Sequence, residues 1–305
     1  RGFLQILGGQ KLADNSKGSG RRELAEWLTD PQNPLTARVM VNRIWHYHFG
    51  RGLVRTTSDF GIRGERPTHP KLLDFLAAEF VANGWSVKQL HRLIMRSQTY
   101  RLASAELETN SKVDPENRFL WRANRRRLDA EQIRDSILAF SRKLDLSPGG
   151  RHPFGHHLTY FYRQHEPFQE SFPTNRRSVY LMQQRIQKDP YLDLFDGPDG
   201  NVSLSERKAT TTTLQALFLM NSEFMHEQSG VLARRILAEA DESPARVQLA
   251  YHLIFGRAAT PAEVDRAEAY LEKVQQPRVG PSSESEAWSG YLRTMISSNE
   301  FLYAE

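Results

Sequence analysis

The chain contains no cysteine among its 305 residues. Disulfide bonds, thiolate nucleophiles, cysteine-ligated zinc, iron–sulfur clusters and a covalently attached c-type haem are therefore excluded within this chain. No stretch approaches the roughly 18 consecutive apolar residues of a membrane-spanning helix, so we expect no membrane span. Several enzyme motifs are also missing from the sequence: the P-loop, the HExxH zinc motif and the G-x-S-x-G elbow.

What is present is an ordinary globular composition with a modest excess of positive charge. Apolar residues make up 39% of the chain and charged residues 25%, which argues against a disordered protein. The net charge of +5 permits an acidic partner, such as an anionic glycan, but does not require one. We expect no nucleic-acid partner, because no helix-turn-helix, zinc finger or aromatic stacking motif accompanies the charge.

Helical periodicity predicts a mainly α fold, and the stretch from Asn33 to Gly50 is its centre. Asn33 is a good helix cap and Gly50 a natural left-handed stop. Asn42 lies within an otherwise largely apolar stripe of this helix, and Arg38 lies one turn before it. A buried amide without partners costs about 1–3 kcal/mol, so groups from elsewhere in the chain should satisfy Asn42 and Arg38.

The pattern along the chain predicts a multi-helical single body. Residues 1–20 read as an incoming linker, and residues 21–305 as one helical domain with helical parts 21–147 and 213–305. Residues 148–212 between them form one long irregular segment, in which Ser178 to Met182 has the pattern of a short strand. The amphipathic faces are too many for each helical half to satisfy alone, so we expect the halves to pack together.

Four polar residues on or next to the central helix are the best candidates for a buried polar centre: Arg38, Asn42, Asp59 and His69. One interpretation is a binding or acid/base site. The alternative is a structural network in which each group is satisfied internally.

Two arginine clusters flank the irregular segment, and their candidate binding residues are Arg125, Arg126, Arg176 and Arg177. Guanidinium forks suit sulfate, phosphate or carboxylate, and the aromatic residues between the clusters suit sugar rings. An anionic glycan contacting this region is therefore the predicted ligand. The alternative is internal pairing with acidic residues near the first cluster, such as Asp129, Glu131 and Asp135.

Histidines give only a weak metal signal. His46 and His48 are two apart on a helix, so their side chains diverge by about 200° and do not share one metal. His152 and His156 in the irregular segment are weak candidates for metal ligands. We therefore expect no cofactor within this chain.

Several long stretches match a known family: RGFLQIL at 1–7, RRELAEWLTDPQNPLTARVMVNRIWHYHFGRGLV at 21–54, DFG and PTHPKLLDFLAAEF within 59–80, GWSVKQLHRLIMRSQTYR at 84–101, RRRLDAEQIRDSIL at 125–138, RRSVYL at 176–181, TTTTLQALFLMNSEF at 210–224 and NEFLY at 299–303. On these strings the chain resembles the C-terminal planctomycete-specific domain, of unknown function, of large exported proteins with an upstream cytochrome-c-like domain. The resemblance covers the chain nearly end to end.

This resemblance implies export to the periplasm or the extracellular space and a longer parent protein. The upstream domains of that parent are then partners, and a haem would belong only to them. The family is also associated with the breakdown of complex polysaccharides. No catalytic residues come with the resemblance.

Two functions remain open from the sequence. The first is a helical binding or scaffolding module that docks a partner domain or a glycan. The second is a carbohydrate-active enzyme with an Arg/His/Asp site around the central helix and the 151–177 loop. An open pocket in which His69, an aspartate and several arginines converge would favour the enzyme, and a closed, paired polar core would favour the module.

Overall fold

The computed structural model describes residues 2–7, 9, 11–12, 18–150, 173–183, 185, 188–207, 209–275 and 284–304. The fold over these residues is mainly α, as the sequence predicts. The described strands, β1 (Arg126–Arg127) and β2 (Tyr303–Ala304), pair in a two-stranded sheet. None of the described helices is both long and apolar enough to cross a membrane.

The described chain divides into two compact units. The first contains the described residues up to Arg126 together with Leu204–Glu206, and the second contains those of Arg127–Ser203 and Arg207–Ala304. The prediction that the helical halves pack into one body stays a prediction. The unit boundary lies within the stretch 21–147, because the helix that follows it contributes Ile133 and Ile137 to the core of the second unit.

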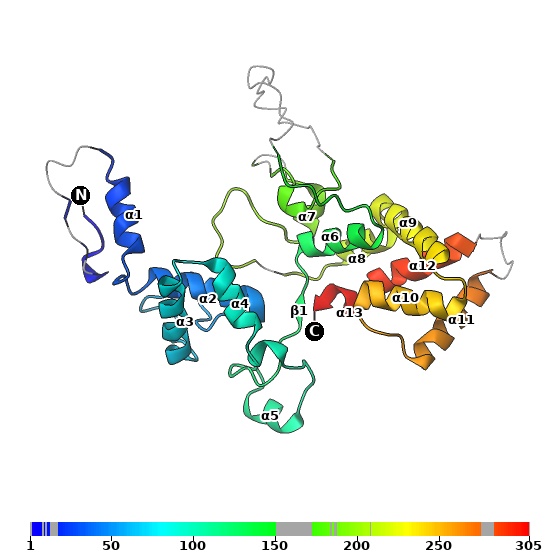
Figure 1. Ribbon diagram of the computed structural model, residues 1–305, viewed down its shortest axis with the longest axis horizontal. Coiled ribbons are helices and arrows are strands. Elements are labelled where there is room, and N and C mark those ends of the chain that lie inside the picture. The colour runs from blue at the N-terminus through cyan, green and yellow to red at the C-terminus, as the bar shows by residue number, and fades with distance from the viewer. Residues whose placement is uncertain are drawn as a thin grey trace, which may run out of the picture. The chain divides into compact units, whose positions relative to one another are not determined.

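The first unit is built around the central helix. Its helical elements are η1 (Gln5–Leu7), α1 (Arg21–Thr29), α2 (Thr36–Phe49), α3 (Pro70–Ala82), α4 (Val87–Met95), η2 (Thr99–Arg101) and α5 (Glu108–Val113). Helix α2 packs on α3 and α4, and the three lie together in blue to cyan in Figure 1. Their inward side chains, including Val41, Trp45, Leu76 and Ile94, form one hydrophobic core.

The ends of α2 follow from the sequence. The side-chain oxygen of Asn33 accepts hydrogen bonds from the backbone nitrogens of Leu35 and Thr36, at 3.0 and 3.3 Å, and so caps the first turn. Gly50 ends the helix with a φ of +74°, and its nitrogen donates to the carbonyl of His46. The predicted stop at Gly50 is confirmed. Helix α2 begins at Thr36 with Leu35 in the N-cap position, two residues later than a cap at Asn33 predicts.

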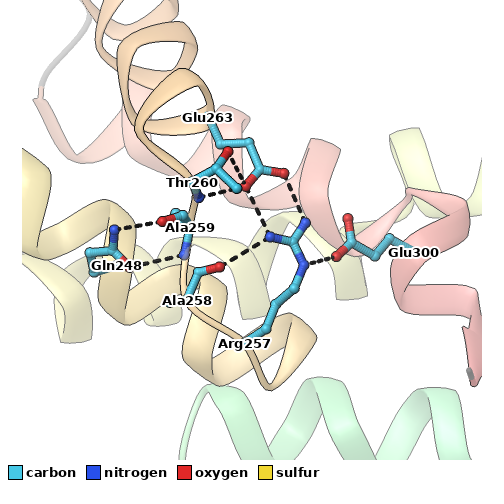
Figure 2. Close-up of polar contacts among 7 residues, drawn as sticks. All are labelled: Gln248, Arg257, Ala258, Ala259, Thr260, Glu263 and Glu300. Atoms are coloured by element: carbon cyan, nitrogen blue, oxygen red, sulfur yellow. Dashed lines mark hydrogen bonds and ion pairs between the residues drawn. The ribbon is translucent and has the colours of Figure 1, made fainter. Parts of the chain in front are cut away.

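The second unit is a helical assembly with its own core. Its elements are α6 (Ala130–Phe140), η4 (Ser178–Tyr180), α7 (Pro190–Leu194), α8 (Thr213–Asn221), α9 (Glu223–Glu239), α10 (Ser243–Phe255), α11 (Pro261–Gln275), α12 (Glu284–Ile296) and α13 (Asn299–Leu302). Helices α9 and α12 make the most extensive packing contact of the unit, and Trp288 and Leu292 of α12 are fully buried. Figure 2 shows the end of α10, where Arg257 binds Glu263 of α11 and Glu300 of α13.

The predicted strand at Ser178 to Met182 is wrong, because Ser178–Tyr180 forms the 3₁₀ helix η4. The backbone nitrogen and the hydroxyl of Ser178 both donate to the Asp135 carboxylate, at 2.8 and 2.7 Å. The nitrogen of Leu181 then donates to the carbonyl of Ser178. The bond to Asp135 and the turn bond at Leu181 use backbone groups of Ser178 and Leu181 that a strand would offer to a neighbouring strand.

Candidate functional site

Asn42 is a structural residue of the first unit. Its amide is fully buried, its Nδ2 donates to the carbonyl of Val54 at 2.9 Å, and its Oδ1 accepts from the nitrogen of Val54 at 2.8 Å. A Cβ on Gly52 would lie 2.8 Å from Nδ2, so the loop approaches the amide only because residue 52 is glycine. The expectation that groups outside the helix satisfy Asn42 is confirmed, since Val54 lies in the loop that follows α2.

The other three candidates near α2 are not brought together. Arg38 donates to Asp74 of α3 at 2.7 Å and to the carbonyl of Pro34. Asp59 accepts from the nitrogen of Gly61 in a local turn. His69 contacts the hydroxyl of Thr68 at 3.0 Å. These bonds hold the helix and its following loop in place, and they join no two of the candidates.

The arginine clusters are also largely engaged. Arg126 donates to the carbonyl of Tyr47, and Arg176 pairs with Asp145 at 3.5 Å. Arg125 is exposed. The exposed side chain of Arg177 makes no hydrogen bond or ion pair with any residue that the structure describes. The first pair belongs to the first unit and the second pair to the second unit.

The histidines of α2 face different partners. His48 Nε2 lies 2.7 Å from His91 Nδ1 of α4, and His46 Nδ1 lies 4.0 Å from a carboxylate oxygen of Glu206. Burial, followed by the neighbouring charges of His91 and Arg126, lowers the pKa of His48 below 6.5. Among the described residues no three histidine or acidic side chains are placed to hold a metal ion. His152 and His156 lie outside the described residues.

A hollow of about 690 Å³ opens on the first unit, within the range of roughly 300–1,000 Å³ for ligand sites. We call it the arginine hollow, and its lining residues are Arg55, Glu65, Arg66, Val113, Asp114, Pro115, Glu116, Arg118 and Phe119. Phe119 is 63% exposed and Val113 is 86% exposed, so apolar groups face solvent here. His69 touches Phe119 edge-on, at 5.9 Å between ring centroids. One of the predicted site residues therefore supports the wall of this hollow.

A tightly bonded loop presents Arg118 and Phe119 to the hollow. The buried carboxylate of Asp114 accepts from the backbone nitrogens of Arg118 and Phe119, both at 2.9 Å. Asn117 is buried and bonds to the backbone of Arg122 with both ends of its amide. Buried polar groups bonded in this way hold a loop in one conformation.

Two residues of this loop have a left-handed backbone conformation. Asn117 and Leu120 have φ values of +50° and +56°, a region that non-glycine residues seldom adopt. Such conformations cost of order 1–3 kcal/mol each and cluster at functional sites. The loop is therefore built to hold an uncommon shape that directs Arg118 and Phe119 outward.

The charges of the hollow are mixed, but they are not equally available. Asp114 is occupied by backbone nitrogens, and Glu116 lies 3.6 Å from Arg55 and 3.4 Å from Arg51. The exposed side chains of Arg66 and Arg118 make no hydrogen bond or ion pair with a described residue, and neither does that of Glu65. The free groups are thus two guanidinium ions and one carboxylate beside an exposed aromatic ring.

Sequence reasoning overlooked this site, because it weighed runs of adjacent arginines. Arg55, Arg66 and Arg118 are single residues far apart in the chain. The sequence does contain one signal for this loop. In the stretch Asp114-Pro115-Glu116-Asn117, the residue types favour a turn in which Asp and Asn side chains bond to nearby backbone groups.

A family comparison covers all of these residues, because the family PSD1, described as "Protein of unknown function (DUF1553)", matches residues 20–271. The chain belongs to the PSD1 family. Neither the curated proteins nor the solved structures give a match to the chain.

The PSD1 match places the arginine hollow inside the family region. The matched region runs from the residue before α1 into α11, and so includes the central helix and the loop at residues 114–120. The description of PSD1 assigns no activity. The chemistry of the hollow is therefore argued from its residues: guanidinium groups bind carboxylate or sulfate, a free carboxylate accepts hydroxyl hydrogens, and an aromatic ring packs on C–H groups.

Proposed function

We propose that the chain is a non-catalytic binding module that takes an acidic glycan in the arginine hollow. The observation that carries the proposal is the contrast between engaged and free groups. Arg38 and Asn42 of α2 are bonded internally, whereas the side chains of Arg66 and Arg118 face a hollow of about 690 Å³ and make no hydrogen bond or ion pair with a described residue.

An acidic sugar fits the mixed chemistry of the hollow better than a bare phosphate or sulfate ion. Arg66 and Arg118 would bind the carboxylate or sulfate, and Glu65 would accept hydrogen bonds from ring hydroxyls. Phe119 offers a ring for the apolar face of the sugar. A small inorganic anion would leave Glu65 and Phe119 without a role and would be repelled by the carboxylate.

The binding module is preferred to the enzyme for a geometric reason. The enzyme hypothesis needs His69, an aspartate and several arginines to converge in an open pocket. Arg38, Asp59 and His69 each bond to a different neighbour. In the arginine hollow, the carboxylate of Asp114 is occupied by backbone nitrogens, and His69 is not a lining residue. Internal bonds of this kind favour a structural role for the residues that make them. The 151–172 part of the predicted loop lies outside the described residues.

The wider setting of the module is also part of the proposal. The resemblance set out above supports an exported parent protein, docking of this chain to upstream domains of that parent, and a link to polysaccharide use. Recognition of an acidic polysaccharide by the arginine hollow would connect these properties.

Calorimetric titration with two forms of one polysaccharide tests the proposed ligand class. Polygalacturonate carries a carboxylate on each sugar, and its methyl ester carries the same sugars without the charge. We expect the acid to bind at least tenfold more tightly, since hydrogen bonds to charged groups are worth about 1.5–3 kcal/mol. Binding should weaken between 0.05 and 0.5 M salt, because the screening length falls below about 10 Å. Equal binding of the two polymers, or no binding of either, would refute the proposal.

A further inference from the structure

A second concave site lies in the first unit, between the C-terminal end of α3 and the exposed side of α4. It is a groove of about 210 Å³, and Phe80, Leu90 and Leu93 supply its apolar floor. Phe80 and Leu90 are buried, while Leu93 is 39% exposed and available to a ligand. The volume is below that of most drug-sized ligand sites, so it fits a small molecule.

The turn between α3 and α4 fixes the walls of this groove. Gly84 and Trp85 both have a positive φ, of +65° and +59°. The nitrogen of Trp85 donates to the carbonyl of Phe80 at 2.9 Å, and the two rings pack edge-to-face at 5.3 Å. Ser86 then caps α4 by accepting from the nitrogen of Gln89. The two helices thus leave the turn in a defined geometry.

Two guanidinium groups line one side of the groove. Arg92 and Arg96 are four residues apart, so their side chains lie on the same face, one turn from each other. Both are exposed, and neither side chain makes a hydrogen bond or ion pair with a residue that the structure describes. Glu79 is the one acidic residue in the lining, and its carboxylate accepts from Asn83 at 3.3 Å. The lining therefore carries a net charge of +1 with two unpaired cations.

We propose that this groove binds a small carboxylic acid with an apolar body. The carboxylate lies between the guanidinium groups of Arg92 and Arg96, and the apolar body packs on Leu93 and the edge of Phe80. The side-chain amide of Gln89, which also lines the groove, supplies a further donor. This site is separate from the arginine hollow, and it does not depend on the proposed glycan.

Basic side chains in the last turn of a helix also have a purely structural use, because they interact favourably with the helix dipole. Arg92 lies in the last turn of α4 and Arg96 is its C-cap residue. That role would show as a change in stability when the arginines are removed. It predicts no preference for a carboxylate, so ligand chemistry distinguishes the two roles.

The test is an NMR titration of the full chain with three probes, followed through the side-chain amides of Asn83 and Gln89. The probes are phenylacetate, the neutral phenylacetamide, and acetate, which lacks the ring. We expect phenylacetate to bind at least tenfold more tightly than either of the others, because it alone offers both a charge and an apolar body. Equal titration by phenylacetate and phenylacetamide would overturn the proposal.

Three variants sharpen the test in opposite directions. Arg92→Gln and Arg96→Gln should each weaken phenylacetate binding about tenfold, and Glu79→Gln should tighten it by removing the opposing charge. Arg101→Gln, an exposed arginine outside the lining, is the matched control and should leave binding unchanged. The melting temperature of each variant shows whether it folds. Undiminished binding in folded Arg92→Gln and Arg96→Gln, or weaker binding in Glu79→Gln, would overturn the proposal.

Discussion

Two arginine sites, one in each unit, serve opposite purposes. In the second unit, Arg257 binds both carboxylate oxygens of Glu263 at 2.8 and 2.9 Å, and one oxygen of Glu300 at 2.6 Å (Figure 2). It also donates to the carbonyl of Ala258. In the arginine hollow of the first unit, the side chains of Arg66 and Arg118 make no hydrogen bond or ion pair with a described residue.

The electrostatics follow the same division. The hydrogen bonds from Arg257 lower the pKa of Glu263 to about 2, and Glu263 in turn keeps the guanidinium charged. Thr260 adds to this by donating to the same carboxylate, which caps α11. An arginine with this many partners fixes a helix junction. The comparison teaches that partners, rather than the density of arginines along the sequence, separate structural arginines from those free to bind a ligand.

The largest expected effect on stability comes from replacing the buried amide of Asn42. Asn42→Leu should lower the free energy of unfolding by about 3–5 kcal/mol, because it leaves both backbone groups of Val54 unpaired and crowds Gly52. Thermal and chemical denaturation measure the loss. Met40→Leu, on the exposed side of the same helix, should stay within about 0.5 kcal/mol of the parent. An unchanged melting temperature in Asn42→Leu would show that the amide is dispensable.

Replacement of Arg257 should have a smaller effect. Arg257→Met leaves Glu263 and Glu300 without their partner, and the side chain is 39% exposed, so we expect a loss of about 1–2 kcal/mol. The lowered pKa of Glu263 means that its contribution is present above about pH 4.5 and is lost as pH falls toward about 2. Denaturation between pH 7 and pH 2.5 should therefore show a shallower acid dependence in Arg257→Met. A slope equal to that of the parent would contradict the role given to this pair.

The histidine pair of α2 and α4, His48 and His91, should make the stability of the first unit decrease in mild acid. The folded-state pKa of His48 is below 6.5, so the unfolded chain takes up a proton first as pH falls. The stability that neutral His48 contributes is present above pH 6.5 and declines below it, until the folded state is protonated as well. His48→Gln should flatten the change in melting temperature between pH 7.5 and 5. A parent protein whose melting temperature rises as the pH falls from 7.5 to 5 would contradict the role given to His48.

The smallest effect on stability is expected in the arginine hollow. The double variant Arg66→Gln/Arg118→Gln should unfold within about 0.5 kcal/mol of the parent, because neither side chain has a described partner to lose. Differential scanning calorimetry measures this directly. A loss comparable to that of Arg257→Met would place these arginines among the structural ones.

Local signals in the sequence were sufficient for much of the fold. Gly50 ends α2 and Asp129 caps α6, as their residue types favour, and Asn33 binds the backbone at the start of α2. Ser222 ends α8 and caps α9 by accepting a hydrogen bond from the nitrogen of Met225. The buried position of Asn42 also followed from periodicity. The helix ends depend on neighbours within a few residues, which a sequence displays directly.

The arginine hollow could not be predicted in the same way. Its walls include Arg55, Arg66 and Arg118. Arg55 is tied to the Asp114 loop by its ion pair with Glu116, and Asp114 holds Arg118 through the backbone. The run Arg125-Arg126-Arg127 suggested a ligand site in the sequence. In the structure, Arg126 donates to the carbonyl of Tyr47 and Arg127 donates to the side chain of Gln215. Whether a charge is free or engaged depends on long-range contacts, and spacing along the chain carries no information about them.

The most direct test of the central claim is calorimetric titration of polygalacturonate into the parent protein, the folded Arg66→Gln/Arg118→Gln variant and Arg22→Gln as control. Arg22 is an exposed arginine of α1 whose side chain pairs only with Glu26 among the described residues, and it does not line the hollow. The account predicts at least tenfold weaker binding for the double variant and unchanged binding for Arg22→Gln. Equal affinity of all three proteins would contradict it, because the acidic glycan would then bind without the free arginines of the hollow.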